Sequence, residues 1–345
     1  MKNPAAFLAK PFFLFRKNAP LPYYILGRLI MMAVTLFILG FAIFGLAALA
    51  PGENASRVML RQNLSGELAE AQRMEPGLDR PFYVQYARWL GQLILHRDLG
   101  LSLESRTPVS FLIGTRLFNS LLLNVISLLF ITFFSFLLGT YLASRAGTGI
   151  DLAVTFFALA LNAFPGILLL ILLELFASLT GLFPVSAYPP FPFRDAPGDF
   201  VFSYAHHVFL PLLASFLGGI GGALRMIRKT MLDQLAEPYI MSLRSRGISE
   251  RRIYLAHAFR NTWKLYISGS AKFLAGLFSA SLILEIIFAY PGIGLLMYEA
   301  VMQEDMNLVL AIFMFISFLV LLGMVISDIS LALVKPNTRY GKDGV

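Results

Sequence analysis

The sequence predicts an all-α, polytopic membrane protein with six transmembrane helices, and three observations support this prediction. Hydrophobic residues make up 57% of the chain and charged residues 14%, against roughly 25% charged residues in ordinary globular proteins. The apolar residues form runs of the length that a bilayer requires, about 20 residues for a helix that crosses roughly 30 Å of hydrocarbon. Basic residues concentrate in some connecting segments and avoid others, as is typical of membrane proteins.

Six apolar runs define the expected spans. Five of them carry no charge: residues 29–50, 117–144, 152–173, 204–224 and 307–327. The sixth, residues 265–290, is apolar except for Lys272 and Glu285. The expected layout is an N-terminal cytoplasmic extension (1–21), a first transmembrane helix (22–50), an external segment (51–116), a transmembrane core (117–334) with a long loop at 225–264, and a cytoplasmic tail (335–345).

The distribution of charge predicts the orientation. The first 28 residues hold five basic residues and no acidic one, and the loop 225–264 holds nine basic and three acidic residues. The loop between the runs 265–290 and 307–327 instead carries Glu299, Glu304 and Asp305 without a base. The positive-inside rule then places both termini and the loop 225–264 in the cytoplasm, with the chain in the inner membrane. The net charge of +8 therefore indicates the cytoplasmic face of a lipid membrane rather than a nucleic-acid partner.

The external segment has the features of short helices and turns. Residues 81–95 have an amphipathic pattern, and turns are expected at Pro76-Gly77 and Asp98-Leu99-Gly100. Ala48-Leu49-Ala50 resembles a signal-peptidase site, but the apolar run before it is too long for a signal peptide. We therefore expect an uncleaved first span.

The loop 225–264 predicts a compact helix–glycine–helix knob. Pro238 suits the first turn of a helix with Glu237 as its cap, and Gly247 suits the left-handed residue that ends it. Ser249 is placed to cap the next helix. Such a basic knob has two interpretations, a surface helix against anionic lipid headgroups or a docking site for a partner.

This loop resembles a known motif. The stretch Glu237-Pro-Tyr-Ile-Met-Ser-Leu-Arg-Ser-Arg-Gly-Ile-Ser-Glu-Arg-Arg-Ile, followed by His257-Ala-Phe-Arg-Asn, is similar to the coupling-helix motif of binding-protein-dependent ABC transporter permeases. The match is to the oligopeptide/dipeptide/nickel branch. The resemblance implies that the knob seats in a groove of an ATPase subunit, whose closure on ATP swings the spans between outward-open and inward-open states.

Three further stretches agree with this family. They are residues 77–90 with Asp98-Leu-Gly and Pro108-Val, Glu285 with Phe288-Ala-Tyr-Pro-Gly-Ile-Gly, and Asp328 with the terminal Lys-Pro-Asn-Thr-Arg-Tyr-Gly. The resemblance covers roughly residues 22–341. The chain departs from the family pattern in its first 20 residues, at Leu243, at Trp263-Lys264 and at Lys335.

The resemblance implies functional residues and partners. The ATPase-coupling residues would be Glu237, Tyr239, Arg244, Arg246, Gly247, Ser249, Arg251, Arg252, His257, Arg260 and Asn261, and the external loop would include Pro291, Gly292 and Gly294. The expected partners are a second homologous permease, two ABC ATPase subunits and an external solute-binding protein. The chain itself would bind no cofactor and hydrolyse no ATP, and the solute would be a peptide, with nickel or glycans as the alternatives.

Polar groups inside the spans are candidates for the translocation pathway, because each charge there is costly unless it finds a partner or water. Glu285 is the first choice, although it could also reach external water. Lys272 and Asp328 could each extend to the inner interface, and for Asp328 pairing at a helix–helix contact is the alternative. Asn119, Asn124 and Asn162 are the remaining candidates, and an amide in a bundle is often a helix–helix hydrogen bond.

Other motifs exclude rival functions. Gly218-Gly-Ile-Gly-Gly222 suits close helix packing and lacks the Gly-Lys-Ser/Thr ending of a nucleotide-binding loop. His206-His207 has no third ligand at a suitable spacing, so no metal site is expected. A self-sufficient secondary transporter would favour inverted repeats, which the sequence does not show. An intramembrane protease would need a Gly-x-Ser-Gly or His-Glu-x-x-His motif, and neither is present.

Overall fold

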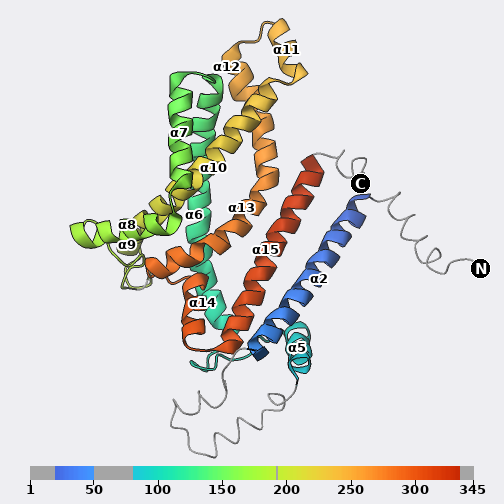
Figure 1. Ribbon diagram of the computed structural model, residues 1–345, viewed down its shortest axis with the longest axis vertical. Helices are drawn as coiled ribbons and strands as arrows, with labels where there is room; N and C mark the ends of the chain where they lie inside the picture. Colours follow the sequence, from blue (N-terminus) through green and yellow to red (C-terminus); the bar gives the residue numbers. More distant parts are fainter. Residues whose placement is uncertain (1–19, 50–80, 192, 335–345) are drawn as a thin grey trace, which may run out of the picture.

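The computed structural model describes residues 20–49, 81–191 and 193–334, which are helical apart from their loops and one isolated bridge between Leu101 and Pro108. The helices lie mostly along one long axis (Figure 1). In chain order they are α2 (Pro20–Leu49), α5 (Phe82–Gly91), η1 (Gln92–His96), α6 (Val109–Ser144), α7 (Gly149–Ala163), α8 (Gly166–Thr180), α9 (Pro197–His207), α10 (Phe209–Leu235), α11 (Pro238–Ser245), α12 (Glu250–Arg252), η2 (Ile253–Ala258), α13 (Phe259–Ile287), α14 (Ile293–Met302) and α15 (Met306–Val334).

The prediction of an all-α polytopic membrane protein is confirmed. Four helices of the described residues are long and apolar enough to cross a bilayer, namely α2, α6, α10 and α15, and the pair α7–α8 makes a fifth candidate. Many large apolar side chains on these helices are exposed, as lipid contact requires. The count of six spans stays a prediction, with α13, a helix of 29 residues, as the remaining candidate.

The third predicted span is not the continuous helix expected over residues 152–173. It is broken between α7 and α8, whose axes differ by 89°. Pro165 explains the break, because a proline clashes with helical backbone at the residue before it. Phe164 accordingly adopts an extended conformation (φ −72°, ψ 131°). The fourth span is also shifted, since α9 ends at His207 and α10 begins at Phe209 and continues to Leu235.

Glycines bring α6 and α10 into close contact. A Cβ at Gly139 of α6 would lie 2.9 Å from Ile227 of α10, and a Cβ at Gly219 of α10 would lie 2.6 Å from Ile131 of α6. Gly221 abuts the carbonyl oxygen of Ala158 on α7 in the same way. The prediction that the glycine cluster at 218–222 serves helix packing is therefore confirmed, and α10 is the central helix of this half of the molecule.

The other half is formed by α2, α5 and α15. Arg28 of α2 makes an ion pair with Asp328 of α15 at 3.2 Å, so the alternative of pairing at a helix–helix contact is confirmed for Asp328. The amphipathic helix expected at 81–95 is present as α5 and η1, and Tyr86 of α5 packs over Gly40 and donates to the carbonyl oxygen of Phe37 at 3.0 Å. The turn at Asp98-Leu99-Gly100 is also present, with Gly100 at φ +83°. The turn expected at Pro76-Gly77 lies outside the described residues.

Candidate coupling surface and buried polar sites

The predicted knob stands at one end of the molecule, where α11 and α12 project beyond the other helices (Figure 1). The α11 helix begins with Pro238 at its first position and ends before Gly247, which has φ +75°. The amide of Gly247 donates to the carbonyl oxygen of Arg244, and that of Ile248 donates to Leu243. This is the glycine-terminated helix end that the sequence predicted.

The capping predictions at Glu237 and Ser249 are correct in position and wrong in detail. Both residues occupy the N-cap position of a helix, but neither side chain makes a capping hydrogen bond. The first turn of each helix is closed by the backbone instead. The carbonyl oxygen of Glu237 accepts from Ile240, and that of Ser249 accepts from Arg252 and Ile253.

A small hydrophobic core fixes the knob to the transmembrane helices. Its buried residues come from the ends of α6 and α10 and from α11 and η2: Ala143, Met231, Ile240, Ile253 and Ala258. Leu243 packs against this core from one side. The departure from the family pattern at this position therefore adds apolar contact inside the knob.

Two sets of polar contacts connect the helices of the knob. Arg244 of α11 forms a two-point ion pair with Glu250 of α12, at 2.7 and 3.1 Å. The guanidinium of Arg244 holds the pKa of the Glu250 carboxyl below its usual range. The amide of Asn261 donates to the hydroxyl of Tyr239 at 3.1 Å, and that hydroxyl donates to Gln234 at 3.3 Å. Asn261 and Tyr239, both predicted coupling residues, thus join α13 to α11.

Most of the predicted coupling residues lie on the outside of the knob. The exposed ones are Glu237, Arg244, Arg246, Gly247, Ser249, Arg251, Arg252 and Arg260, whereas Tyr239, His257 and Asn261 are half-buried. Met241, which was not among the predicted residues, has a side chain that is 75% exposed on α11. An apolar side chain in a basic, water-facing helix is the signal that could have found it, because such residues are enriched where proteins dock.

Glu285 lies at the opposite end of the molecule, where its side chain is fully buried. Its carboxylate accepts from the amides of Gly294 and Leu295 and from the hydroxyl of Ser120. The amide of Ile293 donates to Ser120 at 2.8 Å. Together the two side chains satisfy the free amides at the start of α14, which a helix N-terminus leaves unpaired. The Glu285 side chain therefore does not reach external water in this structure, and its hydrogen bonds position the start of α14, while a role in the translocation pathway stays a prediction.

The predicted external loop, which includes Pro291, Gly292 and Gly294, is held by contacts next to Glu285. The amide of Asn119 donates to the carbonyl oxygen of Pro291, and Tyr290 donates to the carbonyl oxygen of Asn119, each at 2.8 Å. A Cβ at Gly292 would collide with the Glu285 carboxylate, and a Cβ at Gly294 would lie 2.6 Å from the Cα atom of Leu282 in the same helix as Glu285. Asn119, Pro291, Gly292 and Gly294 thus form one structural unit with Glu285.

The remaining pathway candidates do not share a site. Asn124 is buried in α6, and its amide nitrogen has no hydrogen-bond partner among the described residues. Asn162 is exposed at the end of α7 beside Gly222 of α10. Lys272 lies in α13, but its side chain is outside the described part of the chain. Asp328 is paired with Arg28.

Two buried acidic residues were not predicted. Asp151, 1% exposed, forms a two-point ion pair with Arg228 at 2.6 Å and ties the start of α7 to α10. The spacing of Thr148 and Asp151, typical of a capping box, was the available signal. Asp305 binds the amides of Leu103 and Leu308 and so attaches the segment before α6 to the start of α15. A partner some 200 residues away in sequence leaves no local pattern.

Comparison with known proteins defines the class to which this arrangement belongs. Residues 135–340 match the family described as the binding-protein-dependent transport system inner membrane component, and residues 22–128 match the N-terminal family of the same membrane components. The chain belongs to this family of multi-pass membrane permeases.

Individual relatives cover most of the chain. It is 31% identical to the oligopeptide transport system permease protein AppB of Bacillus subtilis over 92% of this chain and 99% of the relative. It is 32% identical to the inner membrane ABC transporter permease protein YejB of Escherichia coli over 76% of this chain and 74% of the relative. It is 26% identical to the metal-staphylopine import system permease protein CntB of Staphylococcus aureus, over 92% and 98%.

Proposed function

We propose that this permease forms half of the translocation pathway of an ATP-driven importer for peptides, and that the loop 237–261 couples it to ATPase subunits. The observation that supports coupling most directly is the construction of the knob. Its exposed arginines and Met241 stand on a core of their own, and helix continues from α12 through η2 into α13. A displacement of the knob is therefore transmitted to a long helix without an intervening flexible loop.

The proposal includes partners and an orientation. A second homologous permease would complete the pathway, forming a heterodimer, with two ATPases on the cytoplasmic side and a solute-binding protein outside. The termini would be cytoplasmic, because the start of α2 and the end of α15 lie toward the end of the molecule that carries the basic knob (Figure 1). The peptide substrate is supported by the relative that bears an oligopeptide name. A metal complex is the second candidate, supported by the relative named for metal-staphylopine import.

Uptake with the substitution Gly247→Arg tests the coupling. Nothing lies within 4 Å of a Cβ at Gly247, so the arginine would project from the knob, although the φ of +75° makes a residue with a Cβ unfavourable there by roughly 1–2 kcal/mol. We expect peptide uptake to be lost while membrane insertion and the amount of protein stay unchanged. Gly181→Arg, at an uncrowded glycine outside the knob that also has a positive φ (+63°), is the matched control and should keep its uptake. Normal uptake by the Gly247→Arg protein would contradict the coupling role.

Isolation of the assembly tests the partners. The tagged chain, purified in mild detergent and cross-linked beforehand, should bring with it a second permease and two ATPases. Recovery of the chain alone would contradict the importer proposal and favour a self-sufficient secondary transporter.

A further inference from the structure

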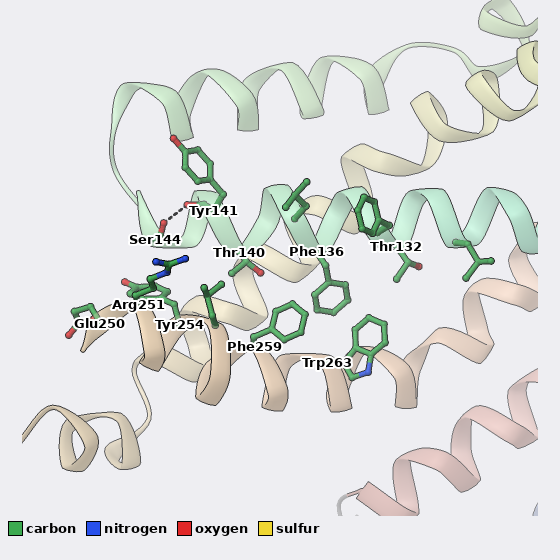
Figure 2. A pocket seen from close by; sticks show the side chains of 14 residues that line it. Thr132, Phe136, Thr140, Tyr141, Ser144, Glu250, Arg251, Tyr254, Phe259 and Trp263 are labelled. Carbon is green, nitrogen blue, oxygen red and sulfur yellow. Dashed lines mark hydrogen bonds between the residues drawn. The ribbon is translucent and has the colours of Figure 1, made fainter. Parts of the chain in front are cut away.

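A groove of about 900 Å³ lies between α6 and the continuous helix η2–α13. Figure 2 shows its lining side chains, which come from both walls; Phe136, Phe259 and Trp263 lie between the two helices. One group of lining residues is aromatic: Phe133, Phe136, Tyr141, Tyr254, Phe259 and Trp263. On α6 the groove extends from Leu129 to Ser144, about 22 Å at 1.5 Å per residue, which exceeds the roughly 15 Å thickness of one hydrocarbon leaflet.

The groove is polar at one end and apolar at the other. Tyr141, Ser144, Glu250 and Arg251 lie together near the knob, whereas Phe136, Phe259 and Trp263 line the part further into the molecule (Figure 2). The carboxylate of Glu250 is already held by Arg244. Arg251 is exposed and has no ion-pair partner among the described residues. The mouth of the groove therefore presents an uncompensated positive charge.

Thr140 lies between the charged mouth and the apolar part of the groove. Its side chain lines the groove between Phe136 and Ser144 and is 7% exposed. Its hydroxyl oxygen has no hydrogen-bond partner among the residues that the structure describes and is itself closed off from the surface. Thr140 therefore marks the depth at which the lining changes from polar to apolar, rather than a contact with a ligand.

We propose that this groove binds an anionic phospholipid of the cytoplasmic leaflet. The phosphate lies against Arg251, the glycerol esters lie at the level of Thr140, and an acyl chain follows the aromatic wall toward Trp263. Charge complementarity selects the anionic lipid, because basic pockets between transmembrane helices on the cytoplasmic side suit anionic headgroups. One wall of the groove belongs to α6 and the other to the helix that continues from the knob, so the bound lipid bridges these two helices.

Tryptophan fluorescence gives a direct test, because the chain has two tryptophans, Trp89 and Trp263. In the full chain carrying Trp89→Phe, Trp263 reports on the groove. The protein is placed in bilayers that contain brominated phosphatidylglycerol in a phosphatidylcholine background, or the reverse, at equal mole fraction of the quencher. We expect brominated phosphatidylglycerol to quench Trp263 with an apparent affinity about fivefold higher, as one basic residue at an anionic surface predicts.

Two pairs of variants make the test specific. Arg251→Gln should abolish the preference for phosphatidylglycerol, whereas Arg252→Gln, which removes the neighbouring charge outside the lining, should keep it. Leu137→Trp, with Trp263 kept, fills the groove, and the amount of bound lipid measured by mass spectrometry should fall. Leu138→Trp, at a residue of the same helix outside the lining, should leave the amount of bound lipid unchanged. Equal quenching by the two headgroups, or a preference that persists in Arg251→Gln, would overturn the proposal.

The assembled transporter needs a separate measurement, because another subunit is a rival occupant. The chain has no cysteine, so Leu137→Cys introduces a unique thiol in the groove. In membranes that contain the whole assembly, we expect this thiol to react with a lipid-soluble maleimide and to form no cross-link with another subunit. Cross-linking of Cys-substituted position 137 to a partner permease would overturn the lipid assignment, and it would do so without affecting the proposed importer function.

Discussion

Glu285 has a structural role that its place in an apolar helix did not predict. A carboxylate near the end of an apolar helix is a good candidate for a pathway residue by cost alone. In the folded chain it accepts hydrogen bonds from two backbone amides and a hydroxyl, which fix the start of α14. The sequence identified Glu285 as a candidate, but it could not predict the contact with Ser120, which lies 165 positions away.

Substitution of Glu285 by alanine should strongly destabilise the contacts at the start of α14. It leaves buried amides and the Ser120 hydroxyl short of a partner, at about 1–3 kcal/mol for each unpaired group. We expect a marked fall in the melting temperature of the detergent-solubilised protein. Glu299→Ala is the control, because this exposed residue forms a longer ion pair with Arg116 at 3.6 Å, which is worth about 0–1 kcal/mol. Equal melting temperatures for the two variants would contradict the positioning role.

The ion pair of Asp151 and Arg228 makes a second residue-scale prediction. Removing one member of a buried pair leaves an unpaired charge, which typically costs about 3–5 kcal/mol. Arg228→Ala should therefore reduce the level of folded protein and its melting temperature far more than Arg252→Ala, which removes an exposed arginine. The double variant Asp151→Asn with Arg228→Ala should recover part of the loss. An Arg228→Ala protein as stable as Arg252→Ala would show that the pair contributes little.

At the scale of an element, the end of α11 depends on the backbone conformation of Gly247. Its φ of +75° is unfavourable for residues with a Cβ, by roughly 1–2 kcal/mol. Gly247→Ala should therefore loosen the knob although there is space for the methyl group. Hydrogen exchange of the α11–α12 peptides should accelerate in Gly247→Ala. The control variant Gly149→Ala, at the first position of α7, should leave the exchange of the α11–α12 peptides unchanged. Unaltered exchange in Gly247→Ala would show that other contacts fix the turn.

The same element has a defined response to pH. The pKa of Glu250 is lowered by its hydrogen bonds from Arg244, so the carboxylate form is favoured when the knob is folded. The contribution of this pair to knob stability is complete above the ordinary glutamate pKa of about 4.3 and is lost as the pH falls through the lowered value. Exchange in α11–α12, corrected for its intrinsic rate, should be constant from pH 7 to about pH 5 and rise below that range. Glu250→Gln should remove this pH dependence, and an unchanged profile in that variant would contradict the assignment.

For the whole molecule, run length and charge were sufficient to predict the helical class and most of the membrane helices. Both signals are local, since a bilayer requires a continuous apolar run and leaves basic residues on one side. The helix–glycine–helix knob was also predictable, because Pro238 and Gly247 have strong positional preferences. The break at Pro165 was overlooked because hydropathy does not register backbone geometry. The pairing of Asp151 with Arg228, and of Asp305 with the segment before α6, could not be predicted, because each depends on helices that meet only after folding.

Exchange over the entire chain should reflect this organisation. The amides bound by Glu285 and Asp305 near the starts of α14 and α15 should be among the slowest to exchange, because their acceptors are buried. Amides of α12 and η2, beside the groove, should exchange faster. The reverse order would contradict this ranking of local stability.

The buried acids also determine where the molecule can bend. At the end away from the knob, Glu285 joins α13 and the start of α14 to α6 through Ser120, and Asp305 fastens the start of α15. At the knob end, α6 and α13 meet mainly through apolar rings beside the groove: Phe136 contacts Phe259 and Trp263 at centroid distances of 5.3 and 4.8 Å. One hydrogen bond, between Thr132 and Tyr266 at 2.8 Å, lies further along the same pair of helices. We therefore expect a displacement of the knob to change the spacing of α6 and α13 at this end first, while the joint around Glu285 keeps its shape.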